Sequence, residues 1–344
     1  MNLTCVSREL HPRHAFRISR GQRTEVRNVF VRLERDGIAG YGEASPNAFY
    51  GETWEGVMGK IEAARGFIAA LDLQTVAGLE AAWGKIWELV APSRAAQCAL
   101  DVAMWDWLAR RRAVSVTELM WSRKPAPVTT FCTIGLSTSE ELAVKVEEVL
   151  TFSRIKIKSD ETASLSTLQQ VRARSAALVA MDANGSWGAT NLRALSERLT
   201  KLGVAFIEQP YPPARDSDVA LARSLLPLMA DESCVTEEDV PRVASLYDGF
   251  NIKLVKCGGL TPARRMLLRG KALKRQMMVG CMLESSALIA AGAVIAQRTE
   301  YADLDGAWLI GDDPFRGWKF ARGILTPPAA PGLGVEPEEG LFEG

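Results

Sequence analysis

Two lysines with the potential for chemistry stand one residue apart in the segment RIKIK, residues 154–158. In an extended chain alternate side chains share a face, so Lys156 and Lys158 would point the same way. Two ammonium groups held close together lower each other's pKa, and a nearby divalent cation lowers it further. A lysine that is partly neutral at physiological pH can take a proton from carbon. We therefore expect Lys158 to act as a base and Lys156 to hold a substrate carboxylate.

Three acidic residues close successive apolar runs and could hold a metal ion. Asp182 follows ALVAM, Glu208 follows VAFI and Asp231 follows PLMA. A single acid in such a place is usually a surface turn residue. Three of them on neighbouring strands would repel one another unless a cation lay between them. Because Mg²⁺ prefers carboxylate oxygens, the sequence predicts one Mg²⁺ held by these three residues.

A third lysine, Lys253 in FNIKLVK, lies four apolar runs beyond the first two. If the runs are strands of one closed sheet, Lys253 approaches the site from the side opposite Lys158. Two lysines on opposite faces of one carbon let a proton leave from one side and return on the other. That geometry is typical of a racemase or epimerase. Lys256 follows closely, and we expect it on the next loop.

The elements that must position these side chains are eight short apolar runs after about residue 125, from TTFCTIG to YADLDG. Their centres lie about 22 to 28 residues apart, with amphipathic patterns such as NLRALSERLTKLG between most of them. This alternation predicts an α/β fold, a (β/α)7β TIM-like barrel, in which residues at the C-terminal strand ends meet at one mouth. A doubly wound sheet is the competitor, but no GxGxxG follows the first strand.

The first third of the chain has a mixed pattern that predicts an α+β domain. NVFVRLERDGIAGYGEAS predicts two strands around an Asp36-Gly37 turn, and three helical patterns follow, up to AAQCALDVAMWDWLARRRA. The tail PPAAPGLGVEPEEG is rich in Pro and Gly, and we expect it to pack irregularly on the first domain.

Composition excludes several classes of function. With 41 basic and 41 acidic residues, the chain gives no sign of binding nucleic acid or an anionic membrane. The best apolar stretch, ALIAAGAVIA, is too short for a membrane span, and the N-terminus lacks the apolar run of a secretion signal. Six cysteines without a CxxC pair indicate reduced thiols in the cytoplasm. The only histidines, His11 and His14, fit neither a zinc site nor a Ser-His-Asp triad.

These motifs, in this order, resemble those of the muconate-lactonizing subgroup of the enolase superfamily. They are KIK at 156–158, DAN at 182–184, EQP at 208–210, DES at 231–233 and NIKLVKCGG at 251–259. The resemblance implies a lysine base and a Mg²⁺-stabilised enediolate. YGEAS and YGET resemble the capping domain that closes the barrel mouth in this superfamily. The implied domains are a cap over 1–120, a catalytic barrel over 121–318 and a tail over 319–344 that packs back on the cap.

Within the subgroup, GCMLESS and the pair Asp303 and Asp305 look most like the dipeptide epimerases. In that family the paired acids bind the α-ammonium group of the dipeptide, and two carboxylates on one face suit a cation. The resemblance implies inversion of the α-carbon of the C-terminal residue through an enediolate. It also places Thr133, Lys156 and Cys281 in the substrate pocket. An arginine of RISRGQRTE, Arg20 or Arg23, could then hold an acidic side chain.

Other functions are compatible with parts of this pattern. The same site could serve an o-succinylbenzoate synthase, an N-acylamino acid racemase or a cycloisomerase, and Lys158 or Lys253 could be the nucleophile of a Schiff-base aldolase. A non-catalytic binding protein has no evident use for both lysines and all three acids. The segment between Lys158 and Asp182 is short for the family, and Asp160 and Glu161 lie just beyond the expected base. Barrel enzymes of this kind often form homo-oligomers, but the sequence leaves the oligomeric state open.

Overall fold

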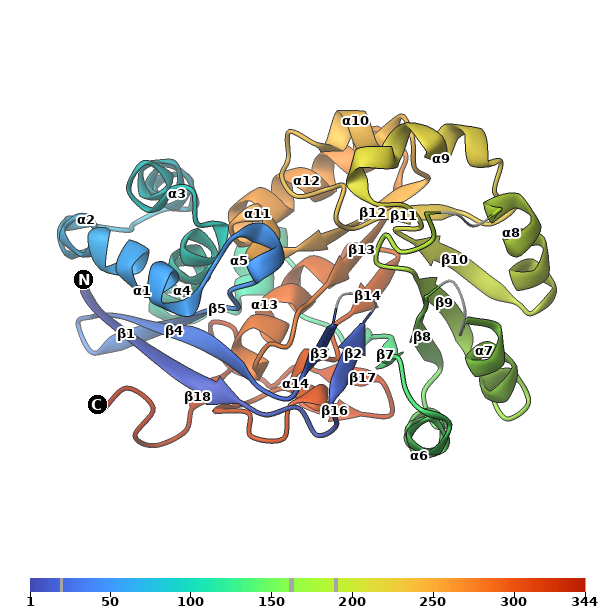
Figure 1. Cartoon of the computed structure of the whole chain (residues 1–344). Helices are drawn as coiled ribbons and strands as arrows, with labels where there is room; N and C mark the ends of the chain where they lie inside the picture. The colour runs from blue at the N-terminus through green and yellow to red at the C-terminus, as the bar shows by residue number, and fades with distance from the viewer. Residues whose placement is uncertain (19–20, 161–163, 189–190, 344) are drawn as a thin grey trace.

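The chain folds into a layered N-terminal part beside a parallel barrel (Figure 1). The structure is a computed structural model that describes residues 1–18, 21–160, 164–188 and 191–343 of the 344-residue chain. None of the helices in these ranges combines the length and apolar character needed to cross a membrane.

The N-terminal part is built on an antiparallel sheet. Its strand order is β1-β4-β5, and the Asp36-Gly37 turn joins the last two strands, as predicted. Both turn residues have positive φ, 54° and 72°, which suits a two-residue hairpin turn. A short separate hairpin, β2 and β3, extends from the sheet toward the barrel (Figure 1). The strands are β1 (Asn2–Leu10), β2 (Phe16–Ile18), β3 (Gly21–Arg23), β4 (Val26–Arg35) and β5 (Ile38–Ala44).

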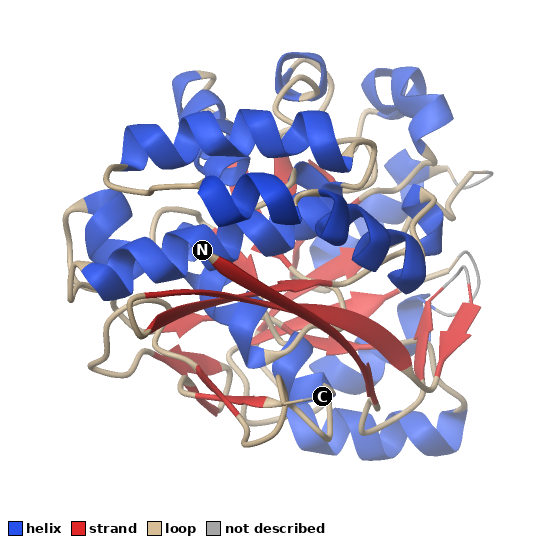
Figure 2. Cartoon of the chain, turned by 90° about the vertical axis from the view of Figure 1, so that its left-hand side faces the viewer, coloured by secondary structure: helices blue, strands red, loops and turns tan. Residues whose placement is uncertain are grey.

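Helices cover one face of this sheet and lie above its long strands in Figure 2. They are α1 (Trp54–Ala63), α2 (Arg65–Ala70), α3 (Val76–Val90), α4 (Arg94–Arg111) and α5 (Val116–Trp121). Every residue of α4 from 95 to 109 is buried. It packs so closely on β5 that a Cβ at Gly42 would lie 2.0 Å from the Ala99 carbonyl oxygen. We call the sheet, the β2–β3 hairpin and these helices the cap.

Eight parallel strands form the barrel, which confirms the predicted architecture. Their order in the sheet follows the chain from first to last, and a hydrogen bond from Phe131 N to Ala302 O (2.8 Å) joins the two ends. The strands are β7 (Cys132–Ile134), β8 (Arg154–Lys158), β9 (Leu178–Asp182), β10 (Val204–Glu208), β11 (Leu228–Ala230), β12 (Gly249–Lys253), β13 (Gln276–Gly280) and β14 (Tyr301–Asp303).

Helices follow most of the barrel strands and cover the outside of the barrel (Figure 1). The apolar stretch ALIAAGAVIA lies in α13, which is buried because it packs against both the barrel and β5 of the cap. The helices are α6 (Ser139–Val149), α7 (Ser164–Arg172), α8 (Leu192–Lys201), α9 (Asp216–Ala222), α10 (Val240–Ala244), α11 (Leu254–Cys257), α12 (Leu260–Ala272), α13 (Ser286–Ala296) and α14 (Gly306–Leu309).

The barrel interior is filled in layers, as a small barrel requires. A lower layer of buried side chains comes from Phe131, Ala180, Phe206, Met229 and Met278, and Tyr301 packs against it. Along each strand, the residue two positions later faces the same interior one layer higher. That layer is charged, and it forms the floor of the site described below.

The C-terminal segment returns to the cap. Leu333 N donates a hydrogen bond to Asp106 Oδ1 at 2.6 Å, and Arg110 of α4 forms an ion pair with Glu336. The segment includes β15 (Phe315–Arg316), β16 (Lys319–Ala321), β17 (Ile324–Thr326) and β18 (Glu336–Pro337), and β6 (Val128–Thr129) pairs with β17. The domain limits at residues 120 and 318 stay predictions.

Candidate active site

The charged layer lies at the C-terminal ends of the barrel strands, where the sequence predicted it. In β8 the side chains of Ile155 and Ile157 pack in the core outside the barrel, so Lys156 and Lys158 point inward. This arrangement explains the alternation of apolar and charged residues in RIKIK. The structure brings together at this mouth residues that lie up to 147 positions apart in sequence, Lys156 and Asp303. All are at most 8% exposed: Lys156, Lys158, Asp182, Glu208, Asp231, Lys253 and Asp303.

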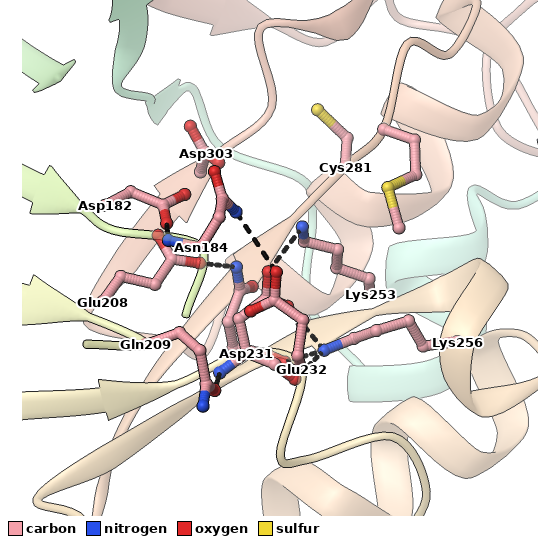
Figure 3. Close-up of polar contacts among 12 residues, drawn as sticks. Asp182, Asn184, Glu208, Gln209, Asp231, Glu232, Lys253, Lys256, Cys281 and Asp303 are labelled. Carbon is pink, nitrogen blue, oxygen red and sulfur yellow. Dashed lines mark hydrogen bonds and ion pairs between the residues drawn. The ribbon is translucent and has the colours of Figure 1, made fainter. Parts of the chain in front are cut away.

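Each of the three acids has its own cationic or amide partner, and Figure 3 shows the two lysines that lie against Asp231. Asp182 Oδ2 lies 2.5 Å from Lys158 Nζ. Glu208 Oε1 accepts a hydrogen bond from Asn251 Nδ2 at 2.7 Å. Asp231 is held from both sides, by Lys253 on Oδ2 and by a further lysine on Oδ1. These partners satisfy buried carboxylates that would otherwise be strongly destabilising.

The pKa values of the acids follow from burial and from these partners. Burial and the neighbouring Asp182 carboxylate raise the pKa of Glu208 to about 8. Burial also acts to raise the pKa of Asp182, but Lys158 and Lys156 outweigh it and lower this pKa to about 2. The site therefore holds more buried acid than its lysines fully compensate, and additional positive charge would keep Glu208 ionised.

The chemistry of this donor set fits Mg²⁺. Asp182, Glu208 and Asp231 present buried, hard oxygen donors from three neighbouring strands. Their oxygens are not drawn tightly together: within the described ranges, the one set of three acidic, His or Cys ligand atoms lying within 4.8 Å of one another belongs to Glu9, His11 and Glu25, on the cap surface. The lysine and amide partners named above account for the spread of the site acids.

The lysines differ from one sequence-based expectation. Lys156 Nζ lies 3.5 Å from Asp182 Oδ2 and 3.4 Å from Glu208 Oε2, and it forms an ion pair with Asp303. Burial acts to lower its pKa, but these acids outweigh burial and raise the pKa well above its usual range. A lowered pKa, expected with a divalent cation beside the lysines, is therefore not seen for Lys156, and the role of Lys158 as the base stays a prediction. For Lys253, too, the carboxylate of Asp231 outweighs burial and the pKa is raised.

Lys158 and Lys253 enter one cavity from different sides. They lie on β8 and β12, separated in the sheet by β9, β10 and β11, and each pairs with a different acid. The cavity has a volume of about 450 Å³ and is lined by Lys156, Lys158 and Lys253 together with Asp231. Neither His11 nor His14 lines it.

Residues of the cap form the roof of this cavity. Phe16, Arg23 and Tyr50 are among its lining residues, so the site is built from both parts of the chain. Arg23 Nη2 lies 3.4 Å from Asn47 Oδ1 on the neighbouring loop. Burial raises the pKa of Tyr50 to about 12, so this phenol stays protonated. Arg20, the alternative to Arg23, lies outside the described residues.

A second acidic pair lies at one side of the cavity. Thr133 N donates to Asp305 Oδ2 at 2.7 Å, and Thr133 Oγ1 lies 3.5 Å from Asp303 Oδ1. Cys281 Sγ lies 3.9 Å from Asp305 Oδ1, and burial raises the thiol pKa well above its usual range. Burial and Asp303 raise the pKa of Asp305 to about 6. A bound cation would relieve this repulsion, which suits an ammonium group.

Sequence analysis missed or misplaced several supporting residues. Lys256 lies in the short helix α11 rather than on a loop, and its Nζ binds Asp231 Oδ1 at 2.6 Å. Asn251 shares a strand face with Lys253, a signal the alternation offered. Gln209 Oε1 accepts from the backbone N–H groups of Asp231 and Ser233, which fixes the loop after β11.

Of the acids beside the expected base, only Asp160 is described. Its backbone oxygen accepts a hydrogen bond from Trp187 Nε1 at 3.2 Å, and Glu161 lies outside the described residues. Asp160 therefore helps to position the loop after β8.

Comparison with known families follows the same division of the chain. Residues 1–121 match the family model described as "Mandelate racemase / muconate lactonizing enzyme, N-terminal domain". Residues 139–341 match the one described as "Enolase C-terminal domain-like".

Relatives of known name cover nearly the whole chain. An L-Ala-D/L-amino acid epimerase from Flavobacterium johnsoniae is 34% identical over 338 residues, 97% of this chain and 99% of that protein. An L-Ala-D/L-Glu epimerase from Escherichia coli is 35% identical over 332 residues, which cover 94% of this chain and 99% of that protein. The solved structure of a dipeptide epimerase from Methylococcus capsulatus, complexed with Mg and the dipeptide L-Arg-D-Lys, is also similar. It is 29% identical with a TM-score of 0.87, and the match covers 97% of this chain and 98% of that chain.

Proposed function

This chain belongs to the mandelate racemase / muconate lactonizing enzyme family of the enolase superfamily, and from that membership we propose that it is a Mg²⁺-dependent dipeptide epimerase. The reaction inverts the α-carbon of the C-terminal residue. The observation that carries the proposal is one buried cavity with lysines on two sides, an acid triad between them and a further acid pair at its edge.

Binding of the dipeptide uses the two acidic groups in different ways. Asp182, Glu208 and Asp231 hold Mg²⁺, which supplies positive charge to the substrate carboxylate and so makes its α-proton more acidic. Lys156, at the same end of the cavity, holds that carboxylate from the side. Asp305 and Asp303, whose carboxylate also pairs with Lys156, take the α-ammonium group of the N-terminal residue. The C-terminal α-carbon then lies between Lys158 and Lys253.

Proton transfer follows from this placement. One of the two lysines, Lys158 or Lys253, removes the α-proton in its neutral form, which the positive charge of Mg²⁺ on the neighbouring acids would favour. Lys156 stabilises the charge on the enediolate oxygen. The other lysine, as an ammonium, returns a proton to the opposite face of the planar carbon. The roof formed by Phe16 and Tyr50 excludes water during this step. Because each lysine serves one face, the assignment of the two lysines is open to a stereochemical test.

That test uses Lys158→Ala and Lys253→Ala. Lys158→Ala should abolish α-proton exchange from one epimer of a dipeptide and spare the other, and Lys253→Ala should show the opposite selectivity, with losses of about 10²–10⁴-fold. Deuterium uptake from D₂O by L-Ala-L-Glu and L-Ala-D-Glu, followed by NMR with Mg²⁺ present, measures both. Wild-type epimerisation by Lys158→Ala would sink the assignment.

A change at Asp305 separates a dipeptide epimerase from the other activities compatible with this site. Asp305→Asn should raise KM for dipeptides on the order of 10–100-fold, because a desolvated ammonium loses a charged partner. An N-acylamino acid racemase or o-succinylbenzoate synthase has no ammonium to bind, so its turnover should change little. The comparison requires steady-state kinetics with a dipeptide and its N-acetylated form. A Schiff-base aldolase would instead be trapped by borohydride with a carbonyl substrate.

The cellular setting and assembly are parts of the same proposal. All six cysteines are free thiols, which supports a reducing compartment such as the cytoplasm. Association into a homo-oligomer stays a prediction, which light scattering on the purified protein would test.

A further inference from the structure

A second, smaller cavity adjoins the active site beside the Asp303 and Asp305 pair. Its volume is about 60 Å³, and it shares Phe16, Thr133 and Leu309 with the larger cavity. Its remaining walls come from residues 12–15 of the cap, from α6 and from Trp308 of α14. No step of the proposed reaction uses this space.

The place of this cavity relates it to the N-terminal residue of the substrate. Thr133, on its wall, contacts both Asp305 and Asp303, which take the α-ammonium group in the proposed function. In a dipeptide the N-terminal side chain and the ammonium group are substituents of the same carbon. An ammonium held by these acids therefore places the start of that side chain beside Thr133 and Leu309, where the second cavity begins.

The walls combine apolar surface with an excess of positive charge. Val149, Trp308 and Leu309 provide the apolar part. Glu148 already pairs with His14 at 2.9 Å. Lys145 Nζ donates to Ser137 Oγ at 3.0 Å, and within the described ranges it has no carboxylate oxygen within 4.0 Å. Glu141 and Glu148 lie near enough to act on the pKa of Lys145, but neither is in ion-pair contact with it. A half-buried ammonium without such a contact favours a ligand that carries a carboxylate or another strong acceptor.

The size of the cavity limits the side chain that can enter. A water-sized group needs on the order of 10–15 Å³ of such space, so a volume of about 60 Å³ admits roughly four to six atoms. Aspartate and asparagine side chains have four non-hydrogen atoms and fit this space, with the acceptor at the end. Alanine would leave most of the space empty, and lysine would bring a second cation to Lys145.

We propose that this cavity is the subsite for the N-terminal side chain of the dipeptide, an inference that rests on the proposed function. Lys145 makes the subsite selective for aspartate, followed by asparagine. The larger cavity under the cap then holds the C-terminal side chain. The enzyme would thus act on dipeptides that begin with a short acidic residue.

A panel that varies only the N-terminal residue tests this subsite. The peptides are L-Asp-L-Ala, L-Asn-L-Ala, L-Ala-L-Ala and L-Lys-L-Ala, and the measurement is kcat/KM for α-deuterium uptake by the C-terminal residue. We expect L-Asp-L-Ala to exceed L-Ala-L-Ala by about tenfold, since a partly buried ion pair forms, and L-Lys-L-Ala to be poorest.

Variants at Lys145 supply the second half of the test. Lys145→Met keeps the length of the side chain. It should bring the ratio of kcat/KM for L-Asp-L-Ala to kcat/KM for L-Ala-L-Ala, the Asp-to-Ala ratio, close to one. Lys145→Glu should favour L-Lys-L-Ala. Lys201→Met, at the exposed end of α8, is the matched control and should keep the wild-type ratio.

The outcomes separate the two proposals. A ratio near one in the wild-type enzyme, or an undiminished ratio in Lys145→Met, overturns the subsite while leaving the epimerase proposal intact. Absence of exchange from all four peptides and from L-Ala-L-Glu overturns the proposed function itself.

Discussion

Single residues in this site carry buried charges whose partners determine what they can do. Lys256 is an example, because its ammonium lies within hydrogen-bond distance of four oxygens: Oδ1 and the backbone O of Asp231, and the backbone oxygens of Cys234 and Asn251. It is 2% exposed and lines no part of the larger cavity. We infer that it positions Asp231 rather than touching substrate.

Replacing Lys256 should therefore weaken metal binding. Lys256→Met removes the hydrogen bonds that orient the backbone and carboxylate of Asp231, so we expect Mg²⁺ affinity to fall on the order of 10–100-fold. Loss of one partner of a buried ion pair should also cost about 3–5 kcal/mol of stability. Calorimetric titration with Mg²⁺ at a temperature where circular dichroism shows a folded variant separates the two effects. Lys271→Met, at an exposed position of α12, serves as control, and unaltered Mg²⁺ affinity in Lys256→Met would contradict the inference.

At this scale the sequence could predict which residue types stand at the site and which face of a strand they occupy. It could not predict which side chains contact one another. The alternation in RIKIK correctly placed Lys156 and Lys158 on the inner face. It could not show that Asp303, from the far end of the chain, would pair with Lys156 and raise its pKa. Asn251 was missed for a related reason, since an amide in a strand becomes informative only when Glu208 is known to face it.

At the scale of elements, helix α4 of the cap supports the strand that carries Lys253. Gly258 and Gly259 follow α11 with φ values of 98° and 115°. An added Cβ would lie 2.5 Å from Gln97 Oε1 at the first glycine and 2.4 Å from Asp101 Oδ2 at the second. Asp101 in turn accepts hydrogen bonds from Thr261 N and Oγ1, so α4 holds the loop between α11 and α12.

Gly259→Ala should disturb this junction. The positive φ and the contact with Asp101 both oppose a side chain, so we expect a loss of about 2–4 kcal/mol in the free energy of unfolding, measured by urea denaturation. Gly84→Ala is the matched control, because a Cβ there, inside α3, meets nothing within 4 Å. That change should raise stability by about 0.5–1 kcal/mol. Equal stability of the two variants would show that the junction is not constrained.

Element type was largely predictable, whereas element environment was not. The spacing of apolar runs predicted eight barrel strands, and each is present. The pattern in AAQCALDVAMWDWLARRRA predicted a helix but not that α4 would be buried on all sides, because its polar residues Gln97, Asp101 and Asp106 look solvent-facing in sequence. Each instead bonds a distant segment.

At the scale of the whole molecule, Glu43 joins the cap to the barrel. It lies at the end of β5, is fully buried, and accepts hydrogen bonds from Asn28 Nδ2 and from the backbone and hydroxyl of Ser285, which begins α13. Burial raises the pKa of Glu43 to about 7. The folded protein therefore retains this proton at a pH where the unfolded chain has lost it.

This proton retention gives the molecule a pH-dependent stability. Between the ordinary value of 4.5 and about 7 the folded state binds more protons, so the free energy of unfolding falls as pH rises through this range. Glu43→Gln should remove that part of the decline, on the order of 1–3 kcal/mol between pH 5 and pH 8. Other buried acids with raised pKa values should keep the remainder of the slope: Glu284 and Glu208 at about 8, Asp101 at about 7 and Asp305 at about 6.

Thermal unfolding at pH 5 and pH 8 measures the effect, with Glu140→Gln on the exposed side of α6 as control. An identical pH dependence in Glu43→Gln and wild type would refute the assignment. The motif YGEAS identified the cap by resemblance, but no pattern in one sequence could show that its glutamate reaches a helix more than two hundred residues later.

The hydrogen bond from Leu333 to Asp106 has a consequence for how the protein is made. During synthesis on the ribosome, Asp106 emerges 227 residues before its partner. At roughly 5–20 residues per second, that delay lasts on the order of 10–50 s. Throughout it, a carboxylate destined for a dry interior has only Tyr41 N and Arg110 to satisfy it. The hydrogen bonds of Asp106 are thus completed only after residue 333 has been translated.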